Sequence, residues 1–143
     1  MENVIILTML GVHAAEDLKR RRIALPCLLV FGLVGAVVQL YCRDMTFFSV
    51  GLGMAVGIGM LLLSLLTKGS IGMGDGLVFC VTGIYLGGAR NLELLFTSLL
   101  YAALFSLFLL AKGRGAVKKR KKEIPFLPFV FLGYGTILLE GLL

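Results

Sequence analysis

The stretch Ser70–Leu77, SIGMGDGL, places the carboxylate of Asp75 among three glycines at the point where an apolar segment begins. A carboxylate inside a membrane span, or at its rim, is costly unless another group offsets that cost. Intramembrane carboxylates are therefore candidate functional residues. The group that pairs with Asp75 has to be sought in the rest of the chain.

The composition places this chain in a lipid bilayer. Of its 143 residues 59% are hydrophobic and 15% are charged, and the mean hydropathy is +1.00, which is too apolar for a soluble domain of this size. We predict an all-α, polytopic membrane protein with about six transmembrane helices, forming one domain over residues 1–143. The predicted spans are 4–18, 24–42, 46–67, 73–89, 92–111 and 126–142.

The basic residues predict the orientation of these spans. The first, third and fifth loops hold four, one and seven Lys or Arg residues, whereas the opposite side has only Arg43 and Arg90. By the positive-inside rule the crowded side is cytoplasmic. The run Lys118–Lys122 lacks interleaved aromatic residues, so we assign it to topology and contact with anionic lipid and not to nucleic acid.

Asp17 is the predicted partner of Asp75. The apolar part of the first span, 4–15, covers only about 18 Å, so a helix that crosses the membrane must continue through Glu16 and Asp17. Asp17 then ends a span that enters the cytoplasm, and Asp75 opens a span that leaves it. Both carboxylates are therefore expected at the cytoplasmic rim.

Two carboxylates at one depth suit a hydrolase that activates water. If they face each other they can share a proton, so that one accepts a proton from water while the other donates one to the scissile carbonyl oxygen. This chemistry requires no metal, cofactor or covalent nucleophile. Gly72, Gly74 and Gly76 carry no side chain and would let an extended substrate strand approach Asp75. The alternative interpretation is that each Asp only caps a helix or pairs with a nearby Lys or Arg at the interface.

Three segments resemble the motifs of the type IV prepilin peptidases, a family of intramembrane aspartic proteases. Gly72–Asp75 is similar to the family's G-x-G-D motif, and Asp17–Ile23 is similar to its first motif, in which an Asp is followed by basic residues. Ile124–Phe129, IPFLPF, resembles the opening of its last span. The chain departs from the family at Ala24 and Leu25, where Pro-Asn is common, and at Leu77, where Lys is frequent.

The resemblance implies a function and a location. Asp17 and Asp75 would be the catalytic pair of an aspartic endopeptidase in the bacterial cytoplasmic membrane, with its active site facing the cytoplasm. The substrates would be prepilin or pseudopilin precursors, cut after the Gly that precedes their hydrophobic helix. Many members also carry a methyltransferase domain with paired C-x-x-C motifs; this sequence has no such motif, so a peptidase-only form is expected.

Two other functions fit the same residues. A small proton- or ion-coupled transporter would also place two carboxylates beside a polar cavity. A non-catalytic assembly factor of a pilus or secretion machine would keep the fold without the activity. His13 lies four residues before Asp17 and so shares its helix face, but we leave it out of the predicted site as an incidental neighbour.

The spacing Gly53-x-x-x-Gly57 in the third predicted span is typical of helices that approach closely in lipid. We interpret these glycines as packing residues.

Overall fold

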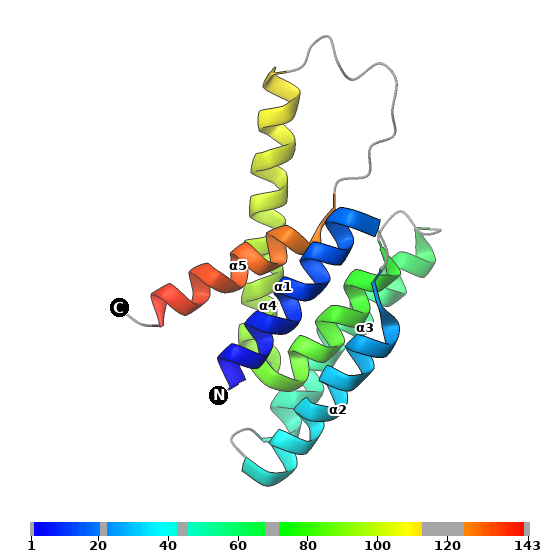
Figure 1. Cartoon of the computed structure of the whole chain (residues 1–143), viewed down its shortest axis with the longest axis vertical. Helices are drawn as coiled ribbons and strands as arrows, with labels where there is room; N and C mark the ends of the chain where they lie inside the picture. The colour runs from blue at the N-terminus through cyan, green and yellow to red at the C-terminus, as the bar shows by residue number, and fades with distance from the viewer. Residues whose placement is uncertain (1, 21–22, 43–45, 68–71, 113–124, 142–143) are drawn as a thin grey trace.

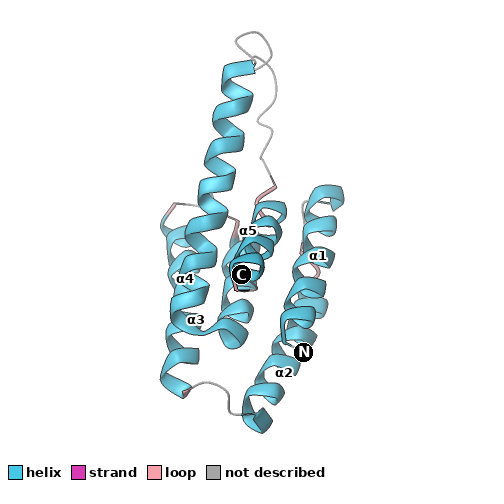
Figure 2. Ribbon diagram, turned by 90° about the vertical axis from the view of Figure 1, so that its left-hand side faces the viewer, coloured by secondary structure: helices cyan, strands magenta, loops and turns pink. Residues whose placement is uncertain are grey.

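The structure is a computed structural model that describes residues 2–20, 23–42, 46–67, 72–112 and 125–141. These residues form an all-α fold whose helices follow one another along the chain (Figures 1 and 2). They are α1 (Glu2–Arg20), α2 (Leu25–Cys42), α3 (Phe47–Leu66), α4 (Met73–Lys112) and α5 (Leu127–Glu140).

Helices are the expected solution for such a chain, because hydrocarbon offers no partner to an exposed backbone N–H or C=O group. By length and composition, α3 and the 73–111 part of α4 are suited to crossing a membrane, and α2 and α5 are shorter apolar helices. Large apolar side chains remain exposed on the outer faces of several helices, as expected where lipid surrounds the protein. Pro26 and Pro128 lie in first turns, where a missing N–H breaks no helical bond.

The predicted fourth and fifth spans lie in one element, α4, and the expected break at 90–91 is not there. The helix changes direction instead at Gly87, whose φ of 69° and ψ of −176° are not helical. A straight helix of 40 residues would be about 60 Å long, twice the thickness of the hydrocarbon core. The kink divides it into a first arm, 73–86, and a second arm, 88–112, which run in different directions (Figure 1).

Hydrogen bonds of the Asn91 side chain stabilise this kink. Its side chain is fully buried, and its Nδ2 donates to the carbonyl oxygens of Phe79 at 2.9 Å and Gly53 at 2.8 Å. Its Oδ1 accepts a hydrogen bond from the Thr82 hydroxyl at 2.8 Å. One amide therefore joins the second arm of α4 to the first arm and to α3, and its polar atoms are satisfied inside an apolar environment.

The first arm of α4 packs backbone to backbone on α3. A methyl group added at Gly53 would overlap the backbone of Gly83, and one added at Gly57 would overlap the backbone of Cys80. The interpretation of Gly53 and Gly57 as packing residues is confirmed. Further along the same seam, Gly76 is in close contact with Leu61 of α3. The glycines of both helices thus fix how the first arm lies.

The second arm of α4 pairs with α5, and α5 pairs with α1. Gly133 of α5 lies against Ser98, and the rings of Phe105 and Phe129 are 5.3 Å apart. The buried core lies between these elements and consists mainly of apolar side chains. It includes Met9, Leu10, Phe79, Leu94, Leu127, Val130 and Tyr134. The C-terminal part of α4 projects past the other helices (Figures 1 and 2).

Because Gly53 lies against α4 and Gly51 does not, substitution of these two α3 glycines by alanine should change stability differently. Gly53→Ala forces a Cβ into the Gly83 backbone and should lower the free energy of unfolding by about 1–3 kcal/mol. Gly51→Ala adds a Cβ with nothing within 4 Å and should be neutral or slightly stabilising, because Ala is the better helix former. Thermal unfolding of the two variants in the same detergent measures the difference. Equal destabilisation by both would contradict the close approach.

Candidate functional site

The candidate site is the end of the bundle at which α1 ends and α2, α4 and α5 begin (Figure 1). Asp17 lies in the last turn of α1 and Asp75 in the first turn of α4, and both side chains are half-buried. Helix ends carry backbone groups without partners in their own helix, so acids here have structural partners available. The structure shows which partners two of the acids take.

Asp17 is bonded to α5. The backbone N–H of Leu127, the first residue of that helix, donates to Asp17 Oδ2 at 3.3 Å. This N–H has no acceptor within its own helix, and a carboxylate beside a helix N-terminus is also favoured by the helix dipole. The bond joins positions 110 residues apart and fixes one oxygen of the carboxylate.

Glu16, the neighbour of Asp17, forms its hydrogen bond with the residue before α2 and not with α5. Its Oε2 accepts a hydrogen bond from the backbone N–H of Ala24 at 3.3 Å, directly before α2. Adjacent residues on a helix point about 100° apart, so the two acids reach two different helices. Glu16 therefore serves the α1–α2 connection, and Asp17 is the acid that faces α5.

Asp75 completes the arrangement from α4. Its backbone N–H donates to the carbonyl of Gly72 at 3.1 Å, which forms the turn into the helix. Its carboxyl group is close enough to that of Asp17 for the two to interact electrostatically. Two acids 58 positions apart in sequence therefore lie at the same end of the bundle.

The three glycines around Asp75 have different neighbours. A Cβ at Gly72 would lie 2.9 Å from Asp75 Oδ2, so this glycine keeps the space beside the carboxylate open. A Cβ at Gly74 would overlap the Ile23 side chain, and one at Gly76 would press on Leu61 of α3. Gly74 and Gly76 are thus explained by packing within the chain. The expected approach of a substrate strand stays a prediction, and it applies best to Gly72.

One further feature lies close to the site. A shallow hollow on α1 is lined by Val12, Ala15, Glu16 and Lys19, on the helix face next to that of Asp17. Among the described residues, no three His, Cys, Asp or Glu side chains gather as a metal site. The basic run Lys118–Lys122 and the loop residues Arg21 and Arg22 lie outside the described residues.

Comparison with protein families identifies the chain. Residues 4–111 match the model of the type IV leader peptidase family. The chain belongs to this family. The match covers α1 to α4 almost completely, and so includes Asp17 and Asp75, but it ends before the IPFLPF segment that opens α5. No curated protein and no solved structure gave a match.

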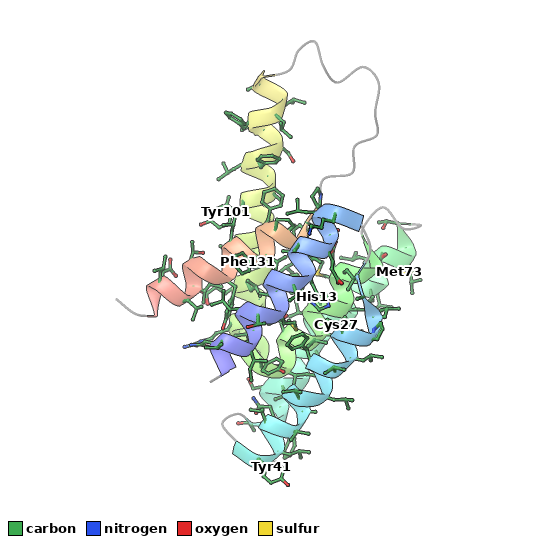
Figure 3. All side chains as sticks on the ribbon, viewed as in Figure 1. His13, Cys27, Tyr41, Met73, Tyr101 and Phe131 are labelled. Atoms are coloured by element: carbon green, nitrogen blue, oxygen red, sulfur yellow. The ribbon has the colours of Figure 1, made fainter. Side chains whose placement is uncertain are left out.

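The family relationship agrees with the apolar helices in making this a membrane protein of the leader peptidase kind. The structure completely buries two polar residues whose burial the sequence analysis did not predict, His13 on α1 and Asn91 on α4 (His13 is labelled in Figure 3). For His13 a signal was present, because residues four apart share a helix face and His13 precedes Asp17 by that spacing. For Asn91 the sequence held no comparable signal.

The bond between Asp17 and α5 has a measurable consequence for stability. Asp17→Ala removes the acceptor of the Leu127 N–H and should lower the free energy of unfolding by about 1 kcal/mol. Asp17→Asn keeps an oxygen acceptor at the same place and should cost less. Thermal unfolding in detergent separates the two variants. An Asp17→Ala protein as stable as the native one would contradict the role of Asp17 at the start of α5.

Proposed function

We propose that this protein is an aspartic endopeptidase that removes the leader peptides of prepilin or pseudopilin precursors. One observation carries the proposal: in a chain of the type IV leader peptidase family, the carboxyl groups of Asp17 and Asp75 interact at one end of the helix bundle. Family membership supports the substrate class, and the interaction of the two acids supports the chemistry.

The reaction needs one acid in each protonation state. The carboxylate takes a proton from a water molecule while the water oxygen bonds to the carbonyl carbon, and the carboxylic acid gives its proton to the carbonyl oxygen. The tetrahedral intermediate then collapses: as the C–N bond breaks, the acid that was protonated by water gives that proton to the leaving nitrogen, and a hydroxyl group of the intermediate returns a proton to the other acid. The products are a carboxylic acid and an amine, and the pair is back in its starting state.

The hydrogen bond from Leu127 suggests how the roles divide. A backbone N–H bonds more strongly to an ionised carboxylate than to a neutral acid. Asp17, which accepts that N–H through Oδ2, is therefore the better candidate for the base that activates water. Asp75, whose flank is kept open by Gly72, is the better candidate for the acid that meets the substrate carbonyl.

The orientation of the protein is part of this proposal. We infer six membrane crossings, made by α1, α2, α3, the two arms of α4 and α5, with the site at the cytoplasmic side. The excess of Lys and Arg in the first and fifth loops supports this orientation. A precursor that enters the membrane by its hydrophobic helix would then present the peptide bond before that helix to the two acids.

Cleavage of a precursor tests the proposal. The native protein, co-expressed with a prepilin, should give a product shortened at the Gly before the hydrophobic helix, as measured by mass spectrometry. Asp17→Asn and Asp75→Asn should each lower the cleavage rate by about 100-fold or more, because each removes one proton-transfer group.

Glu16→Gln is the matched control, because it changes the neighbouring acid and keeps the oxygen that accepts the Ala24 N–H. It should cleave within a few-fold of the native rate. If native protein that is folded in the membrane cuts none of several prepilins, the proposed function is wrong. If the Asn variants cut as fast as the Glu16→Gln control, the assignment of the two catalytic acids is wrong.

A further inference from the structure

His13 is a buried polar side chain that the proposed chemistry has not used. It is fully buried on α1, one turn before Asp17. Its Nδ1 lies 2.8 Å from the carbonyl oxygen of Met9. A carbonyl oxygen can only accept a hydrogen bond, so Nδ1 carries the proton and donates. The other ring nitrogen, Nε2, is then an acceptor in the neutral imidazole.

This acceptor has no hydrogen-bond partner among the described residues, although it is buried. The ring is held in place by its bond to Met9 and by an edge contact with Phe31 of α2, with ring centroids 6.3 Å apart and planes 68° apart. A buried acceptor without a partner lowers stability, and an apolar side chain of similar size would avoid the cost. A buried polar atom without a partner is expected mainly at functional sites, where the side chain is kept for its chemistry.

The position of His13 on α1 relates its imidazole ring to Asp17. Side chains four residues apart on a helix have Cβ atoms about 6 Å from each other, so His13 and Asp17 are neighbours on one face. Neither ring nitrogen of His13 bonds directly to Asp17 in the described part of the chain, and a single water molecule can span such a separation. Asp17 Oδ2 is already engaged by Leu127, and the second oxygen of the carboxylate is the one that can reach such a water.

We propose that His13 is a positioning residue of the Asp17–Asp75 site, and that its Nε2 accepts a hydrogen bond from the water that attacks the substrate. Water has two hydrogens: one is transferred to Asp17, and the other is held by His13. With both hydrogens directed, a lone pair of the water oxygen faces the scissile carbonyl carbon. His13 exchanges no proton in this scheme. The inference rests on the proposed function, because it concerns the water of that reaction.

Two substitutions at position 13 separate the acceptor from the shape of the ring. His13→Phe keeps an aromatic ring against Phe31 but removes the acceptor. It should lower kcat for prepilin cleavage at least tenfold, leave KM within twofold, and unfold at the native temperature or higher. His13→Gln places an amide oxygen where Nε2 lies and should keep kcat within about threefold of native.

The control is Met9→Leu, which changes a buried side chain one further turn from Asp17 and keeps the backbone carbonyl that holds His13. It should leave kcat unchanged. Full kcat in His13→Phe overturns the proposal, because the acceptor would then have no part in the reaction. Equal losses in His13→Phe and His13→Gln also overturn it, because the loss would then reflect the shape of the side chain.

A second measurement does not depend on cleavage. The chain has a single histidine, so 15N-labelled histidine gives one imidazole spectrum. We expect the proton on Nδ1 and an Nε2 signal that shifts when Asp17 is changed to Ala but not when Glu16 is changed to Ala. If the chemical shift of Nε2 is the same in Asp17→Ala as in the native protein, the proposed role of His13 is wrong, whatever the cleavage result. Absence of prepilin cleavage by native protein overturns the proposed function instead.

Discussion

The contact between the backbones of Gly53 and Gly83 is the constraint on which the position of Asp75 depends. In lipid, two apolar helices gain little from hydrophobic burial against each other, so they associate through close packing and through hydrogen bonds between buried polar groups. Here the glycines of α3 and of the first arm of α4 supply the packing, and Asn91 supplies the hydrogen bonds. The first arm of α4 is thereby held in register with α3. Its first turn, which carries Asp75, is placed as a result.

The acids of α1 show how one helix end can organise several others. Glu16 accepts the N–H before α2, and Asp17 accepts the first N–H of α5. An acid that bonds to the start of a helix is partly neutralised by that helix, which eases the cost of keeping a carboxylate near the membrane. A structural role and a catalytic role for Asp17 therefore do not exclude each other. The hydrogen bond at the start of α5 uses one oxygen of Asp17, and the other oxygen is available for the proposed chemistry.

Much of this arrangement could be predicted from the sequence. Hydropathy gives the apolar helices, and the spacing of Gly53 and Gly57 gives the close approach of α3 to its neighbour. The alternation of the spans predicts that Asp17 and Asp75 lie at one end of the bundle. These features are local, because each depends on residues that lie within one helix or at its end.

What the sequence could not show depends on contacts between distant residues. The polar pair Arg90-Asn91 suggested a loop, because hydropathy does not distinguish an exposed amide from one that three hydrogen bonds satisfy inside the bundle. The break falls at Gly87, where a positive φ is tolerated. The bond between Asp17 and Leu127, and the burial of His13, likewise depend on how helices far apart in the sequence meet.

The juxtaposition of Asp17 and Asp75 is the central claim, and a distance measurement by electron paramagnetic resonance tests it most directly. Spin labels would be attached to cysteines that replace both acids, after Cys27, Cys42 and Cys80 are changed to Ser. We predict a spectrum broadened by dipolar coupling. A control pair at 17 and 41 should show much weaker coupling, because position 41 lies about 24 Å along α2 from its start. A 17/75 spectrum equal to the sum of the two single-label spectra would contradict the account.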